Sequence, residues 1–114
     1  MKRKPHPDPV TPEVYEHVRR RDFWQCIAPV LPLAPGALEP CDGPIQLDHI
    51  HGSGLSKRGP SRAWNLASLC RHHHDWKTKR ARAWRERLDW YVLTFEKSAR
   101  TDPEAAKYLP VAAW

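Results

Sequence analysis

The stretch LCRHHHDWKTKR, residues 69–80, places one cysteine and three consecutive histidines at the start of a segment that favours a helix. Cys70 and His73 have the C-x2-H spacing, which lets one turn of chain present two ligands to a single metal ion. His74 lies about 100° further around a helix than His73, so neighbouring histidines can bind two different ions. The stretch therefore predicts two adjacent metal sites, whose other ligands must come from elsewhere in the chain.

The first predicted site is a structural zinc centre, which requires four nitrogen or sulfur ligands and no open position. The predicted ligands are Cys26, Cys41, Cys70 and His73. Two alternatives stay open: His72 or His51 could replace His73, and the cysteines could instead be small residues of the core. In a reducing compartment, three cysteines favour metal binding or free thiols over disulfides.

The second predicted site holds a catalytic ion, which needs fewer protein ligands, oxygen included, and room for water and substrate. Asp48 and His49 are adjacent in PIQLDHI, residues 44–50. In a strand their side chains leave opposite faces, so one can bind an ion while the other approaches a water molecule. A neutral imidazole is a suitable general base near pH 7, and His74, turned away from His73, could serve this second ion.

Two segments have the sequence signals of helices. TPEVYEHVRRRD, residues 11–22, has Thr11 as a candidate N-cap and Pro12 at the first helical position. From about His73 to Ser98, apolar residues recur at intervals of three to four, which predicts one long helix with a buried stripe. The segment from Thr101, beginning TDPE, resembles a further helix start.

Two segments favour strands. FWQCIAPV, residues 23–30, predicts the first strand of a hairpin, and residues 44–50 predict the second. Between them lies a loop marked by its prolines and glycines. Most of the six tryptophans are expected to pack in the core, and base stacking is the alternative.

Composition points to an anionic partner. The 114 residues suit one domain, and 19 Lys+Arg against 13 Asp+Glu give a net charge of +6. Basic residues flank the second predicted site, and phosphate contacts are expected from Lys57, Arg58, Arg62, Lys77, Lys79 and Arg80. No apolar run reaches the roughly 18 residues of a membrane span, and no signal-peptide core follows the basic N-terminus. We therefore expect an intracellular protein that binds a nucleic acid and no membrane.

The segments LDHI and WNLASLCRHHHDWKT together resemble the signature of the HNH endonucleases, in order and in spacing. The resemblance covers residues from about 15 to 80, roughly two thirds of the chain. It implies an α+β fold with a ββα-metal (His-Me finger) core: a zinc-braced hairpin and a helix around one divalent ion, with an N-terminal and a long C-terminal helix beside it. The Pro-rich, basic composition of residues 1–10 predicts a flexible arm, which leaves a nuclease domain over 11–100 and an extension over 101–114.

The resemblance also assigns roles to individual residues. His49 matches the general base, Asp48 the acidic metal ligand before it, and His74 a second ligand of the same ion. Asn65 matches the asparagine that fixes the loop positioning the base, and Lys77 a frequent lysine whose role is less settled. The implied reaction leaves 3′-hydroxyl and 5′-phosphate ends, with Mg²⁺, Mn²⁺ or Ni²⁺ at the catalytic site and Zn²⁺ at the structural one.

One feature departs from the family pattern. The first pair of zinc ligands is usually C-x2-C, whereas fourteen residues separate Cys26 from Cys41. The two cysteines can converge if IAPVLPLAPGALEP, residues 27–40, loops out.

The predicted function is metal-dependent endonuclease activity on DNA, either nicking or double-strand cleavage. Two alternatives remain: a zinc-stabilised DNA-binding module whose catalytic centre is inactive, and a small nuclease subunit that needs a partner, such as a terminase in phage DNA packaging. The compact size suggests a phage-encoded protein in the cytoplasm of a bacterial host. His72 has no assigned partner and is expected to face solvent or phosphate, and His51 is expected either at the loop surface or in support of the site.

Overall fold

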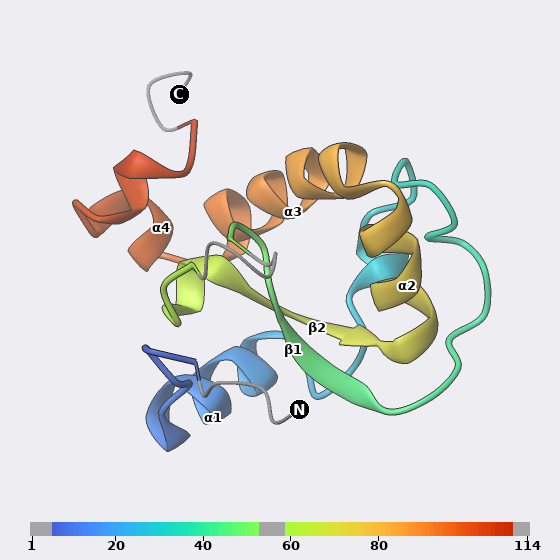
Figure 1. Ribbon diagram of the computed structural model, residues 1–114, viewed down its shortest axis with the longest axis horizontal. Helices are drawn as coiled ribbons and strands as arrows, with labels where there is room; N and C mark the ends of the chain where they lie inside the picture. Colours follow the sequence, from blue (N-terminus) through green and yellow to red (C-terminus); the bar gives the residue numbers. More distant parts are fainter. Residues whose placement is uncertain (1–5, 53–58, 111–114) are drawn as a thin grey trace.

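Two antiparallel strands and four α-helices make up the part of the chain that the computed structural model describes, residues 6–52 and 59–110. The elements follow one another as α1 (Pro12–Arg21), β1 (Ile45–His49), β2 (Leu66–Cys70), α2 (Arg71–Lys79), α3 (Ala81–Phe95) and α4 (Ser98–Thr101) (Figure 1). Short 3₁₀ turns occur at Ala28–Val30, Ala63–Asn65 and Ala105–Lys107. The predicted α+β class is confirmed at this level.

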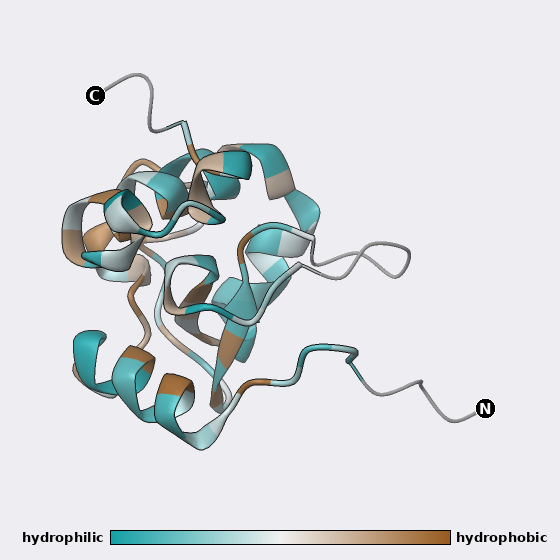
Figure 2. Ribbon diagram, turned by 90° about the vertical axis from the view of Figure 1, so that its left-hand side faces the viewer, coloured by the Kyte–Doolittle hydropathy of each residue, from teal (hydrophilic) through white to brown (hydrophobic). Residues whose placement is uncertain are grey.

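Helix α1 forms as its sequence predicts. Thr11 is the N-cap, and its Oγ1 accepts a hydrogen bond from the backbone N–H of Val14 at 3.2 Å. Pro12 occupies the first helical turn, where its missing N–H costs nothing. Figure 2 shows α1 as a mostly hydrophilic ribbon with hydrophobic bands one turn apart, and Val18 is fully buried. The helix thus packs one narrow apolar stripe against the rest of the chain.

The strand predicted for residues 23–30 is wrong. Phe23 and Trp24 both have positive φ, 56° and 58°, which no extended strand allows. Their backbone N–H groups donate to the carbonyls of Arg20 and Arg19, so the segment begins as the closing turn of α1. The pairing partner of β1 is instead β2, with Asp48 opposite Ala67 and His49 opposite Leu66.

The single helix predicted from about His73 to Ser98 is also wrong. The chain breaks at Arg80, whose φ of −128° and ψ of 52° are not helical, so α2 and α3 are separate. A continuous helix of this length would extend about 39 Å in one direction. The break instead turns α3 back across the sheet, as Figure 1 shows, where Trp84 and Leu88 are fully buried.

The fourteen residues between Cys26 and Cys41 do not loop out. Ile27 and Leu31 are buried in the same core as α3, and the carbonyl of Pro35 accepts a hydrogen bond from Trp84 Nε1 at 2.9 Å. Gly36 has φ of 75°, and a Cβ there would lie 2.2 Å from the indole of Trp76. The segment is therefore a packed cover, and its glycine permits the close approach to α2.

A buried carboxylate joins three of these elements. Asp22, which caps α1, accepts hydrogen bonds from the Ser68 backbone N–H in β2 at 2.9 Å and from the Tyr91 hydroxyl in α3 at 2.7 Å. Arg21 pairs with the same carboxylate at 2.8 Å and also donates to the carbonyl of Leu66. This network fixes α1 and α3 relative to the sheet.

No helix in the described residues is long and apolar enough to cross a membrane.

Candidate metal and catalytic site

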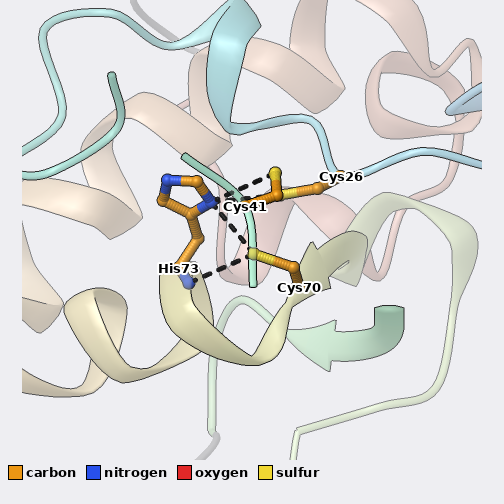
Figure 3. A group of neighbouring side chains, drawn as sticks. All are labelled: Cys26, Cys41, Cys70 and His73. Atoms are coloured by element: carbon orange, nitrogen blue, oxygen red, sulfur yellow. Dashed lines mark hydrogen bonds between the residues drawn. The ribbon is translucent and has the colours of Figure 1, made fainter. Parts of the chain in front are cut away.

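The four predicted zinc ligands converge in space (Figure 3). His73 Nδ1 lies 3.5 Å from Cys26 Sγ, 3.6 Å from Cys41 Sγ and 3.1 Å from Cys70 Sγ. All four ligand atoms lie within 4.8 Å of one another. Zinc–sulfur bonds of about 2.3 Å and zinc–nitrogen bonds of about 2.0 Å place tetrahedral ligands about 3.5 Å apart. The cluster could therefore hold a metal ion such as zinc.

Separate parts of the fold supply these ligands. Cys26 follows the turn after α1, and Cys41 ends the packed cover, so the cover brings the two together. Cys70 ends β2, and its Sγ accepts a hydrogen bond from the backbone N–H of His73 at 3.4 Å in the first turn of α2. Burial raises the pKa of Cys26 to about 12 and also raises the pKa of Cys41. Thiols of this kind become thiolates when a bound cation compensates their charge.

A second group of charged side chains lies between β1 and α2. Asp48 Oδ2 is 3.2 Å from His74 Nδ1 and 3.0 Å from Lys77 Nζ. The Asp48 oxygen and the His74 nitrogen are both buried, and neither has an aligned hydrogen-bond partner within the described part of the chain. Two atoms that each lie about 2.1 Å from one ion are about 3 Å apart. The spacing of the Asp48 oxygen and the His74 nitrogen is compatible with two ligands of one ion, and the Lys77 ammonium also contacts this oxygen.

Contacts within this group shift the pKa values of Asp48 and His74. Burial alone would raise the pKa of Asp48, but its contacts with His74 and Lys77 outweigh burial and hold that pKa below its usual value. The contact with Asp48 raises the pKa of His74. Asp48 is thus ionised at neutral pH, as a metal ligand must be.

His49 leaves β1 on the face opposite Asp48. Its Nε2 lies 3.0 Å from Ser61 Oγ, and its backbone carbonyl accepts a hydrogen bond from Lys77 Nζ at 2.6 Å. Burial, followed by the nearby His6, lowers the pKa of His49. The ring is therefore neutral at pH 7 and able to accept a proton.

Asn65 closes the loop that follows β1. Its Oδ1 accepts from the His51 backbone N–H at 2.8 Å, and its Nδ2 donates to the carbonyls of His51 at 3.1 Å and Pro60 at 2.9 Å. Asn65 is fully buried. Gly59 lies against it, where a Cβ would be 2.0 Å from the His51 carbonyl oxygen. Asn65 thus joins the two ends of the loop directly beside His49.

The remaining histidines of interest lie outside the zinc cluster. His72 is on the surface, and its Nε2 contacts Glu39 Oε1 at 2.9 Å. His51 is mostly buried, and its Nε2 contacts Asp89 Oδ1 at 2.6 Å. It is His73, and not His72 or His51, that lies beside the three cysteine sulfurs. The two alternative fourth ligands predicted from the sequence are therefore wrong.

The basic residues predicted to contact DNA have different surroundings. Lys57 and Arg58 lie outside the described residues. Arg62 is ion-paired with Asp8 and Glu104. Lys77 is only 4% exposed, so its ammonium is part of the Asp48 group rather than of a surface. Lys79 and Arg80 are exposed at the end of α2.

Three residues beside His49 were not predicted from the sequence. The His6 ring stacks on the His49 ring, with centroids 4.8 Å apart and planes 9° from parallel. The Ser61 hydroxyl contacts His49, and Asp8 binds Ser61. Residues 6–8, expected as part of a flexible arm, are therefore packed against the site. Nothing in their spacing signals this contact, which depends on the tertiary fold.

Comparisons with protein-family models, curated proteins and solved structures found no match for the chain. Its function is therefore inferred from the geometry of these residues.

Proposed function

We propose that the protein is a metal-dependent endonuclease of the HNH type, which hydrolyses phosphodiester bonds of DNA. The observation that carries the proposal is the buried pair Asp48 Oδ2 and His74 Nδ1, 3.2 Å apart, with His49 at the next position of β1. Two candidate metal ligands and a candidate general base are thus neighbours, the combination that hydrolysis of a phosphodiester uses.

The order of elements supports a ββα-metal core. β1 carries Asp48 and His49, β2 pairs with β1, and α2 follows β2 directly and carries His74. The two candidate ligands of the catalytic ion therefore come from a strand and a helix whose relative position is fixed by the intervening strand.

In the proposed reaction, His49 accepts a proton from the attacking water molecule, since its ring is neutral near pH 7. Asp48 and His74 would hold a divalent ion such as Mg²⁺, Mn²⁺ or Ni²⁺. When bound, the ion supplies charge stabilisation at the phosphate and the departing 3′ oxygen. Lys77 donates to the backbone carbonyl of His49 itself and Asn65 to that of His51, so both hold the chain in place at and just after His49. The products would carry 3′-hydroxyl and 5′-phosphate ends.

A basic surface beyond α2 supports DNA as the substrate. A shallow hollow of about 430 Å³ between α2 and α3 is lined by Lys79, Arg80 and Arg82, with Glu86 as its acidic residue. The net charge of +6 favours a polyanion in general. Phosphate contacts by these side chains would position the duplex without reading its sequence.

The Cys₃His cluster is proposed to bind structural Zn²⁺ and to hold the catalytic helix. Cys70 is the N-cap of α2, and His73 lies in its first turn, one residue before His74. A closed four-ligand site leaves no position for water, so it would contribute stability rather than chemistry.

A second candidate function is a zinc-stabilised DNA-binding module without catalysis. The Lys77 ammonium lies 3.0 Å from Asp48 Oδ2 and already balances its charge, so the group can be a structural ion-pair network. A third, a nuclease subunit that acts only with a partner such as a phage terminase, makes the same residues catalytic.

Plasmid cleavage separates the first two candidates. Zinc-loaded protein is incubated with supercoiled DNA and Mg²⁺, Mn²⁺ or Ni²⁺, with wild type beside His49→Ala. We expect nicked or linear product from wild type and a loss on the order of 10²–10⁴-fold in the variant, the usual contribution of a general base. His72→Ala, which changes an exposed histidine of the same stretch, is the matched control and should cut normally. The nuclease proposal fails if wild type and His49→Ala cut equally, or if wild type is inert on every DNA form with every ion.

A further inference from the structure

We infer that Ser61 and the segment from His6 to Asp8 form part of the catalytic site and hold His49 in the tautomer whose Nδ1 is free to accept a proton. The inference rests on the proposed function for its consequence, but its structural content is independent of any activity. The hydrogen-bond partners of the Ser61 hydroxyl carry the inference.

The Ser61 hydroxyl has two polar neighbours. One is the backbone carbonyl of Asp8, to which Oγ is hydrogen-bonded. The other is His49 Nε2, at 3.0 Å. A carbonyl oxygen can only accept, so the single hydroxyl hydrogen of Ser61 is directed to Asp8. Ser61 Oγ must then accept from His49, and the hydrogen on the neutral ring is on Nε2.

The consequence concerns the second ring nitrogen. In a neutral imidazole, one nitrogen carries the hydrogen and the other has a lone pair. With the hydrogen on Nε2, the lone pair of His49 is on Nδ1, and this atom is the base of the proposed reaction. Ser61 is thus a positioning residue, because it acts through His49 and not on the substrate.

The carbonyl of Asp8 is itself held in place. Asp8 Oδ2 accepts hydrogen bonds from the Ser61 backbone N–H at 3.0 Å and from Arg62 Nη1 at 2.9 Å. Arg62 Nε in turn pairs with Glu104 Oε1 at 3.2 Å. Both the backbone and the side chain of Asp8 therefore bind the segment that carries Ser61, which fixes the direction of its carbonyl.

His6 completes the arrangement. Its ring lies parallel to the His49 ring at 4.8 Å and covers one face of it. His6 Nδ1 accepts a hydrogen bond from the backbone N–H of Asp8 at 2.9 Å, which fixes the ring on the same short segment. The stacked His6 ring and the hydrogen bond to Ser61 together oppose rotation of the His49 ring about its Cβ–Cγ bond. The N-terminal segment therefore orients the base as well as selecting its tautomer.

The direct test is nitrogen NMR of histidine side chains in the full-length, zinc-loaded protein at roughly pH 8, where free imidazoles are neutral. Long-range proton–nitrogen spectra of ¹⁵N-histidine protein distinguish a protonated from a bare ring nitrogen, and His49→Ala assigns the signals. We expect wild-type His49 to carry its hydrogen on Nε2. Wild-type protein with the hydrogen on Nδ1 would overturn the inference, whether or not the protein cuts DNA.

Variants then link the tautomer to the reaction. Ser61→Ala should give a mixture of tautomers and slow plasmid cleavage at least tenfold, and Ser61→Thr, which keeps the hydroxyl, should restore both. Thr94→Ala is the control, because its exposed hydroxyl binds the carbonyl of Trp90 in its own helix, α3. Zinc content and circular dichroism verify that each variant is folded. Folded Ser61→Ala with the wild-type tautomer and rate would contradict the inference. If wild type proves inert on DNA, the nuclease proposal fails while the tautomer result still decides the role of Ser61.

Discussion

At the scale of single residues, three adjacent histidines have three different environments. His72 is on the surface beside Glu39, His73 faces the three cysteine sulfurs, and His74 contacts Asp48. The cause is helical geometry, because consecutive side chains leave a helix about 100° apart. A run of identical residues can therefore belong to two sites and a surface at once.

Asn65 gives a prediction about stability at this scale. Asn65→Ala removes three hydrogen bonds and leaves the buried backbone N–H of His51 without its acceptor. An unsatisfied buried group costs about 1–3 kcal/mol, so we expect the free energy of unfolding to fall by about 2–3 kcal/mol. Urea denaturation of zinc-loaded protein measures it, with Thr78→Ala as an exposed control that should change little. A loss below about 0.5 kcal/mol for Asn65→Ala would show that the loop is held by other contacts.

The sequence predicted some of these residues and not others, for a physical reason. Cys70, His73 and His74 have a short spacing that a helix converts directly into geometry, so their separation into two groups was predictable. Ser61 and His6 were not, because an isolated serine or a histidine near a terminus has no local pattern that signals its neighbour. Their role depends on contacts across 12 and more residues of chain, which only the tertiary fold establishes.

At the scale of elements, the turn after α1 is unusual. Phe23 and Trp24 both adopt the left-handed conformation that costs roughly 1–2 kcal/mol for each residue with a side chain. The turn directs Asp22 inward to its network and leaves Phe23 81% exposed. Trp24 packs beside α1, with the guanidinium of Arg19 5.3 Å from its ring centroid. The turn therefore places Asp22 in its hydrogen-bond network and leaves the backbone strained at Phe23 and Trp24.

Relief of this strain is a second prediction. Phe23→Gly should raise the free energy of unfolding by about 0.5–1 kcal/mol, because glycine is the usual residue at this helix end and the exposed phenyl ring contributes little packing. Trp24→Gly is the comparison, in which lost contacts with Arg19 and Tyr15 should offset the gain. Chemical denaturation of both variants measures the difference. A destabilised Phe23→Gly would mean that the phenyl ring supports the fold.

The elements differ in how far their sequences predict them. Helix α1 has its cap, its proline and its apolar spacing in one local stretch, so its bounds were predicted almost to the residue. Residues 23–30 have the composition of a strand, but the closing turn of α1 uses them first. The break at Arg80 has no proline or glycine to mark it, and beyond it α3 buries Trp84 and Leu88 in the core. Local signals thus predict ends that are locally capped, and miss those set by packing.

At the scale of the whole molecule, the Cys₃His cluster connects distant parts of the chain. Cys26 and Cys41 bracket the packed cover, and Cys70 and His73 join β2 to α2. A chain of 114 residues has a limited core, so such a connection matters more than it would in a larger domain. The four residues thus join the cover to the start of α2.

Removal of the metal is the third prediction. Structural zinc contributes about 10–16 kcal/mol in small domains, which matches or exceeds the 5–15 kcal/mol stability of an ordinary domain. We expect a strong chelator or Cys70→Ser to abolish the cooperative thermal transition seen by circular dichroism, with about one zinc per chain in the untreated protein. The His72→Ala variant should keep its zinc and its transition. A chelated protein that melts like the untreated one would remove the case for a structural zinc centre.

The most direct test of the whole account is plasmid cleavage by His74→Ala protein that retains its zinc. His73 is the proposed zinc ligand and His74 the proposed ligand of a separate catalytic ion, so this variant should hold about one zinc per chain, as wild type does. It should cut supercoiled DNA on the order of 100-fold more slowly, because it lacks a proposed ligand of the catalytic ion. Equal cleavage by zinc-loaded His74→Ala and wild type, or loss of zinc on this substitution, would contradict the division of the histidines between two sites.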